Sequence, residues 1–187
     1  MNSGKKVLLA MAIAAITSGS ALADLDGGGG KITFTGLVIS APCSIKAEDI
    51  DKKVDLGDVT DTYINANTHS EAKDSSITLE NCALSSSDNG AGTPVSKAKV
   101  TFTSSNVVSG NPNLLSNTFA GGATNVGVRL MDGDGANIVL GTAKEIPLDP
   151  DSVTQRLPFL AWMEKSNSVA ATAGGVTSVV NYTLAYN

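Results

Sequence analysis

The spacing of apolar residues constrains the fold of this 187-residue chain more than any other feature. Apolar side chains recur at every second position in short stretches, and Thr, Ser, Asn and Gly are dense between the stretches. Such alternation is typical of half-buried β-strands, whereas an amphipathic helix repeats every 3.6 residues. The alternating stretches are 32–34, 54–56, 77–79, 100–102, 126–130 and 138–140, followed by longer runs at 157–163 and 176–186. Short strands at this spacing predict an all-β sandwich.

The first 23 residues have the pattern of an export signal. Lys5 and Lys6 precede the uncharged run 7–16, and residues 21–23 read Ala-Leu-Ala, the small-x-small ending that signal peptidase recognises. The run is too short for a transmembrane helix, which needs about 20 residues. We therefore expect a signal peptide at 1–23, with an uncleaved anchor as the alternative. The mature chain 24–187 then fits one domain.

The two cysteines, Cys43 and Cys82, both lie in the exported part, where the environment is oxidising. They predict one disulfide, which closes a loop of about 40 residues and contributes on the order of 4 kcal/mol in the chain-entropy model. The alternative is metal ligation, but zinc would require two further ligands and His69 is the only histidine. We therefore expect no metal.

Charge and motifs argue against several classes of function. The formal net charge is −5, and no basic stripe is present that could neutralise phosphates, so we expect no nucleic-acid partner. His69 has no thiol nucleophile once the disulfide forms, and the glycine run 27–30 lacks the lysine and helix of a phosphate loop. Residues 132–135, Asp-Gly-Asp-Gly, predict a hairpin in preference to a calcium loop, whose closing glutamate is missing. We expect neither enzyme activity nor a cofactor.

Four motifs follow one another along the mature chain and are distinctive as a set. They are the segments 36–45 (GLVISAPCSI), 79–82 (LENC), 125–132 (NVGVRLMD) and 182–187 (YTLAYN). Together they resemble chaperone–usher pilins of the type 1 and P pilus kind. Gly174 and Tyr186 also fall where that family has two C-terminal landmark residues. The resemblance implies an incomplete immunoglobulin-like β-sandwich that lacks its last strand. A donor strand from a chaperone or a neighbouring subunit then completes the sandwich in trans.

The resemblance assigns the C-terminal segment to one side of an open acceptor groove. Even positions from 176 to 186 are mostly apolar, so one face of this segment would need a partner strand to cover it. A periplasmic chaperone would cover it first and hold the terminal carboxylate with basic residues. The residues expected in the groove and in the chaperone-binding strand are Val176, Val180, Tyr182, Leu184, Tyr186 and Asn187. Without the resemblance, this segment is an ordinary core strand that ends the chain.

The N-terminal segment 24–35 is predicted to be the strand that each copy donates. Gly28, Gly30, Ile32 and Phe34 share one parity, so the two large side chains would enter a neighbour's groove while a glycine meets a shallow part. The glycine run leaves open how far toward Asp24 the strand stays ordered. The alternative is a disordered tail that ends near residue 31. Residues 36–187 would then form the pilin domain.

The resemblance implies a structural subunit of a chaperone–usher fimbria. Such a subunit is exported through the periplasm, passes the outer-membrane usher, and joins other pilin subunits head to tail in a cell-surface filament used in adhesion. The alternatives are a minor adaptor or terminating subunit of the same pilus and, from other classes, a free-standing secreted β-sandwich that binds a ligand, or a hydrolase.

Overall fold

The computed structural model describes residues 29–87 and 94–187, and the chain divides into two units, Met1–Leu37 and Val38–Asn187. The described part of the first unit, 29–37, has no helix or strand. Its large apolar side chains are exposed, with Ile32 78% and Phe34 89% accessible. The alternating stretch at 32–34 therefore forms no strand within its own chain. The signal peptide expected at 1–23 lies outside the described residues.

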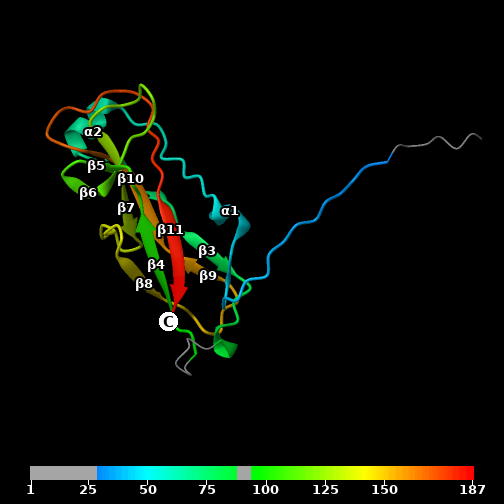
Figure 1. The fold of residues 1–187 in the computed structure, drawn as a ribbon. Coiled ribbons are helices and arrows are strands. Elements are labelled where there is room, and N and C mark those ends of the chain that lie inside the picture. Colours follow the sequence, from blue (N-terminus) through cyan, green and yellow to red (C-terminus); the bar gives the residue numbers. More distant parts are fainter. Residues whose placement is uncertain (1–28, 88–93) are drawn as a thin grey trace, which may run out of the picture. The chain divides into compact units, whose positions relative to one another are not determined.

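The second unit is built from three antiparallel ladders (Figure 1). The first ladder contains, in spatial order, β1 (Ser44–Ile45), β3 (Ile77–Glu80) and β9 (Gln155–Leu157). The second contains β2 (Lys73–Asp74), β10 (Phe159–Lys165), β7 (Val126–Asp132), β6 (Asn111–Ser116) and β5 (Val107–Val108). The third contains β11 (Asn181–Tyr186), β4 (Lys97–Thr103) and β8 (Ala143–Pro147). Only Pro158 separates β9 from β10, so the first two ladders are joined along the chain.

The core lies between the third ladder and the other two. β4 alternates buried and more exposed side chains, and β10 does the same, which is the pattern of strands with one face on a core. The rings of Phe102 on β4 and Phe159 on β10 meet edge to face, with their centroids 4.8 Å apart. β7, at the centre of the largest ladder, is buried along its whole length. The expectation of an all-β sandwich is therefore confirmed.

Two of the expected strands are wrong. Residues 54–56 form no strand, although Val54 and Leu56 are half-buried and Asp55 between them is exposed. Residues 138–140 also form no strand. In both stretches the alternation reflects burial of apolar side chains against the core. Neither stretch has a neighbouring strand with which it forms a ladder. The run 176–186 is a strand only from residue 181 onward, as β11.

The turn at 132–135 forms as expected, but the second strand of its hairpin is minimal. The N–H of Gly135 donates to the carbonyl of Asp132 at 3.0 Å, and Gly135 has a φ of 82°, which glycine adopts without strain. After the turn, pairing is limited to a single bridge between Met131 and Asn137. In this bridge the Ile138 N–H donates to the Leu130 carbonyl and the Asp132 N–H donates to the Ala136 carbonyl, each at 2.9 Å.

The helices are short: α1 (Ala47–Ile50), α2 (Asp61–Asn67) and the 3₁₀ turn η1 (Leu84–Ser86). The Thr60 hydroxyl caps α2 by accepting the N–H of Tyr63 at 3.1 Å, and Thr68, with a φ of 71°, ends it. Within the described residues, none of the helices has the length and apolar character needed to cross a membrane. Sequence analysis missed α2, although Thr60 followed by Asp61 is a recognisable N-terminal signal.

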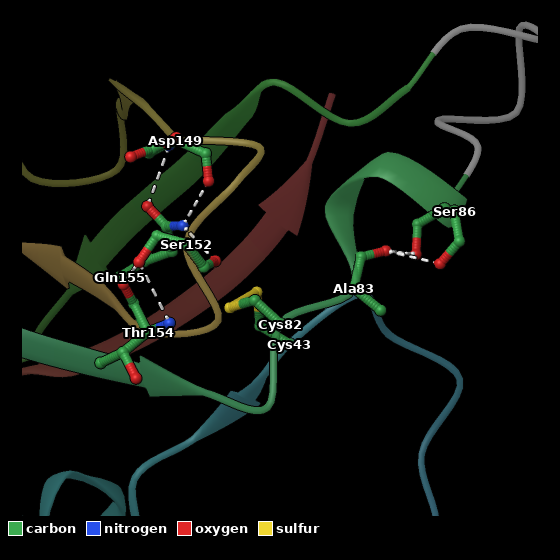
Figure 2. Close-up of a disulfide and its surroundings, with 9 residues drawn as sticks. Cys43, Cys82, Ala83, Ser86, Asp149, Ser152, Thr154 and Gln155 are labelled. Atoms are coloured by element: carbon green, nitrogen blue, oxygen red, sulfur yellow. Dashed lines mark hydrogen bonds between the residues drawn. A yellow bond between two sulfur atoms is a disulfide. The ribbon is translucent and has the colours of Figure 1, made fainter.

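The predicted disulfide between Cys43 and Cys82 is present (Figure 2). It connects the residue before β1 to a residue just after β3, and both cysteines are buried. The Cys82 N–H donates to the carbonyl of Val153 at 3.0 Å, in a loop that the buried Gln155 side chain holds by hydrogen bonds to the carbonyls of residues 149 and 152. The bond therefore fastens the beginning of the sandwich to its core.

Candidate functional site

An apolar groove of about 1210 Å³ runs beside the C-terminal segment. Residues 171–182 form one wall, and residues 50–61 form the opposite wall. The strands of both layers supply buried side chains to its base, namely Ile77, Phe102, Leu115, Val128, Leu130, Ala161 and Met163. The groove thus opens directly onto the hydrophobic core.

The C-terminal wall alternates regularly along its length. Even positions from 176 to 186 are half-buried, and odd positions from 177 to 187 are exposed. The residues of this segment that pack against the buried core are Val176, Val180, Tyr182, Leu184 and Tyr186. Ser178 is the polar member of the same face, and its hydroxyl donates to the Ser116 carbonyl at 2.8 Å. The structure therefore brings five of the six expected acceptor residues onto one face, whereas Asn187, at an odd position, is exposed.

The backbone of this segment has one paired edge and one open edge. Asn187 and Lys97 exchange both of their backbone hydrogen bonds, each 3.0 Å long. Since backbone groups alternate in direction along a strand, the odd residues of β11 pair with β4 and the even residues point their N–H and C=O groups the other way. Within the described residues, β11 is the terminal strand of its ladder and these even groups have no recorded backbone partner. The groove is therefore bordered by an unpaired strand edge.

Side-chain amides hold the wall upstream of β11. Asn65 on α2 exchanges two hydrogen bonds with the backbone of Ala171, at 2.8 and 3.0 Å. Asn117 donates to the Gly175 carbonyl and accepts the Thr177 N–H, both at 2.9 Å. These amides satisfy backbone groups that no strand pairs, and so they keep the wall in place without closing the groove.

Tight glycine contacts fix the same segment. A Cβ on Gly122 would lie 2.2 Å from the Gly175 carbonyl oxygen, and one on Gly174 would lie 2.4 Å from the Ala123 nitrogen. Gly174 also has a φ of 153°. Only glycine permits this close approach of two backbones. Gly174, noted above as a landmark residue, thus has a packing role at the mouth of the groove.

The opposite wall is anchored through α1. Asp49 is 3% exposed, and its carboxylate accepts the Thr78 N–H of β3 at 2.7 Å and an ion pair from Lys52. Burial raises the pKa of Asp49, but the hydrogen bonds from Lys52 and Thr78 outweigh it and leave the pKa below its usual value. The Tyr182 hydroxyl donates to the Asp49 carbonyl at 2.7 Å. Burial, with a smaller contribution from the Asp49 charge, raises the pKa of Tyr182, so the hydroxyl stays protonated.

The remaining predicted residues are placed as follows. Asn187 ends the chain beside the start of β4, and its carbonyl accepts the N–H groups of Ser96 and Lys97. Of the expected donor residues, Gly30, Ile32 and Phe34 are exposed and in no strand, and Gly28 lies outside the described residues. Sequence analysis missed the site role of Asp49 and of residues 50–61 in the opposite wall. The only sequence signal for this wall was the alternation of apolar residues at 54–56.

His69 takes part in a structural cluster. Its ring stacks on Trp162 with centroids 3.9 Å apart, and the Trp162 Nε1–H donates to Glu164. Glu164 also accepts two hydrogen bonds from Arg129, at 2.9 and 2.7 Å. In the part of the chain that the structure describes, no three His, Cys, Asp or Glu residues are grouped so as to hold a metal ion.

Comparison with known proteins identifies the class. The sequence matches the fimbrial protein family over residues 32–187. It is 50% identical to the fimbrial-like protein YbgD of Escherichia coli K12 over the full length of both chains. It is 30% identical to the Pap fimbrial major pilin protein of Escherichia coli over 95% of each chain.

Solved structures agree with the sequence comparison. A subunit in the structure of a chaperone–usher pilus aligns with a TM-score of 0.72 at 28% identity, covering 86% of this chain and 97% of that subunit. The P pilus rod subunit PapA aligns with a TM-score of 0.63 at 28% identity, covering 79% of this chain and all of PapA.

The chain belongs to the fimbrial protein family, as a chaperone–usher pilus subunit. Its fold is the incomplete immunoglobulin-like sandwich of that family, and it is a structural subunit of extracellular surface fimbriae that associates with other pilin subunits. The family, the fold class and the structural function expected from the sequence are thereby confirmed.

Proposed function

We propose that each copy of this pilin donates residues 24–35 to the groove of the next copy and receives the same segment from another. The observation that carries this proposal is the groove itself, which combines an apolar base with an unpaired strand edge. Ile32 and Phe34 are exposed apolar side chains of one parity, which a groove of this kind would cover. Donor and groove are different surfaces, so the contact is heterologous and produces an open filament.

The energies involved suit stable assembly. Burial of Ile32 and Phe34 would contribute roughly 1.5–3 kcal/mol each. Each new backbone hydrogen bond along the even residues of the C-terminal wall adds about 1 kcal/mol net. The unpaired edge also explains why a subunit needs cover before assembly, because an open edge beside apolar side chains promotes aggregation.

The open groove and the position of Asn187 also support a route by which the subunit reaches the cell surface. Residues 1–23 direct export and are removed, and a periplasmic chaperone covers Val176–Tyr186 with its own strand. The chaperone binds the Asn187 carboxylate, which lies at the open end of β11 next to Lys97, and an outer-membrane usher then exchanges the chaperone strand for residues 24–35 of the next copy. The role is structural and not enzymatic.

Placing a negative charge on one face or the other of the donated segment tests the donor assignment. Ile32→Asp and Phe34→Asp should be exported normally but should reduce filament formation at least about tenfold, because a buried carboxylate without a partner costs far more than the ~1.4 kcal/mol that corresponds to tenfold. Thr33→Asp is the matched control, since it adds the same charge on the opposite parity. Electron microscopy of surface filaments and the amount of exported subunit are measured together. Filaments of normal number from both Asp variants would contradict the proposal.

A further inference from the structure

We propose that Leu37 and Ile39 of the donating copy dock in a second cavity of the receiving copy, beyond the end of its groove, and that this contact fixes the angle between successive subunits. We call this cavity the end pocket. Its volume is about 480 Å³, and residues 108–109, 116–117, 119 and 121–126 line it. The inference rests on the proposed donation of residues 24–35.

The odd-numbered face of the N-terminal segment changes from polar to apolar at residue 37. Odd positions of the donated part are Lys31, Thr33 and Thr35, which suit a face that stays in water when the even positions enter a groove. The next odd positions are Leu37 and Ile39, which are 87% and 51% exposed in their own copy. A groove that covers the even positions of a strand cannot cover these two side chains. A different surface is therefore needed to remove them from water.

The direction of the donated strand decides which end of the groove these residues reach. Every strand pair in the described residues is antiparallel, and an antiparallel donor has its carboxyl end near residues 171–177 of the receiving copy. At the opposite end the Tyr182 hydroxyl bonds the Asp49 carbonyl and so joins the two walls. Leu37 lies two residues beyond Thr35, which places it within about 7 Å of the point where the donated segment ends.

The end pocket adjoins the groove at this same end. Ala123 and Val126 are both buried and line both cavities. The end pocket also contains Phe119, whose side chain is 52% exposed. A Cβ on Gly175 would lie 3.0 Å from the Phe119 ring, so the ring packs directly on the wall of the groove. A chain that leaves the groove here therefore passes an exposed aromatic ring.

Hydrogen bonds hold the loop that carries Phe119 against the groove wall. The Thr118 N–H donates to the Thr177 carbonyl at 2.8 Å. The Asn117 side chain accepts the Phe119 N–H at 3.0 Å and donates to the Ala123 carbonyl at 2.9 Å. The residues that line the end pocket are all uncharged. The end pocket is thus a preformed, neutral surface that suits aliphatic side chains.

A second point of attachment would limit the motion between two subunits. Gly36 separates the donated segment from Leu37, and nothing lies within 4 Å of its Cβ position. Because glycine restricts the backbone little, a subunit held by one strand alone could swing about this residue. Docking of Leu37 and Ile39 beside the strand would remove that freedom. We therefore expect the end pocket to control the stiffness of the filament.

Two aspartates on the odd-numbered face test the donating side. Full-length chains with Leu37→Asp/Ile39→Asp should form filaments in numbers within about twofold of wild type, but the persistence length should fall at least about threefold, because the charges resist burial in a neutral pocket. Thr33→Asp/Thr35→Asp is the matched control. It adds the same charges to the same face within the donated part and should change neither quantity. Electron micrographs of surface filaments give both measurements.

A charge in the end pocket tests the receiving side. Phe119→Asp should lower the persistence length as the Leu37→Asp/Ile39→Asp change does. Phe119→Tyr should not, because the ring remains. Val139→Asp is the matched control, since Val139 is also 52% exposed but does not line the end pocket.

Two results of these measurements would overturn the proposal. One is wild-type stiffness in filaments of either the Leu37→Asp/Ile39→Asp chain or the Phe119→Asp chain. The other is loss of filaments from the Leu37→Asp/Ile39→Asp chain, which would show that both residues belong to the donated strand itself.

Cross-linking distinguishes docking in the end pocket from strand donation. Ser40→Cys, next to Ile39, would be combined with Ser109→Cys in the end pocket or with Ile50→Cys at the opposite end of the groove. A short bis-maleimide, added to purified filaments, should produce a covalent ladder at least about tenfold stronger from the 40/109 pair. Thr33→Cys/Val179→Cys reports donation, because it joins the donated segment to the groove wall.

The two ladders are read together. A 33/179 ladder with an equal or stronger ladder from the 40/50 pair, or with none from the 40/109 pair, would overturn docking in the end pocket and leave strand donation intact. Filaments that give no 33/179 ladder would contradict strand donation, and this proposal with it.

Discussion

At the residue scale, Asp49 is the side chain that connects most of the site. Its carboxylate binds the backbone of β3, and its carbonyl receives the Tyr182 hydroxyl of β11. A buried carboxylate stays charged only with such partners, and here the hydrogen bonds from Lys52 and Thr78 lower its pKa despite burial. The position of α1, and with it one wall of the groove, depends on this ionised side chain.

Asp49 predicts a specific dependence of stability on pH. Because its folded pKa lies below the unfolded value near 3.8, its contribution is present above about pH 4 and is lost as the pH falls through the lower folded pKa. Asp49→Asn should lower the free energy of unfolding by about 1–3 kcal/mol at pH 7. The difference from wild type should shrink below pH 4, as measured by urea unfolding in a Phe34→Asp background that prevents assembly. A constant difference from pH 7 to pH 2 would contradict this account.

At the element scale, the C-terminal segment is held in place by two kinds of contact. β11 is paired with β4, whereas the stretch before it is fixed by amide side chains and by glycine contacts with the loop 117–124. The amide and glycine contacts leave the groove side of the backbone free, which strand pairing on both edges would not do. The open groove therefore depends on glycines at particular positions.

Gly174→Ala should be costly for that reason. A methyl group there would lie 2.4 Å from the Ala123 nitrogen at a φ of 153°, and we expect a loss of about 3 kcal/mol or more. Gly135→Ala is the matched control, because Gly135 also has a positive φ, 82°, but nothing lies near its Cβ position. It should cost only about 1–2 kcal/mol. Similar urea midpoints for the two variants would refute the close-contact explanation.

The sequence predicted the elements whose alternation coincides with strand pairing. The strands at β3, β4, β7, β10 and β11 follow from the period-two spacing of apolar residues, and the disulfide follows from two cysteines in the part of the chain expected to be exported. Residues 54–56 and 138–140 alternate equally well but pair with no strand, because alternation reports burial and not hydrogen bonding. The roles of Asp49 and Gly174 could not be predicted, since each depends on contacts between segments far apart in the chain.

At the scale of the whole molecule, an unfilled groove and an exposed apolar segment occur in the same chain. The groove lacks a strand, and residues 29–37 are without secondary structure in their own copy. Each feature would promote aggregation of an isolated protein, but in a filament one neighbouring copy fills the groove and another covers the segment. The central claim is therefore that residues 24–35 complete the sandwich of another molecule and thereby stabilise it.

Thermal unfolding with an added donor peptide tests this claim most directly. The chain with Phe34→Asp cannot donate, but its groove is intact and can bind a synthetic peptide of residues 24–35. At a peptide concentration about 100 times Kd, binding contributes ~2.7 kcal/mol, which should raise Tm by on the order of 5–10 °C. A peptide carrying Phe34→Asp should have no such effect. A Tm that ignores the wild-type peptide at saturating concentration, or that rises equally with both peptides, would contradict strand donation.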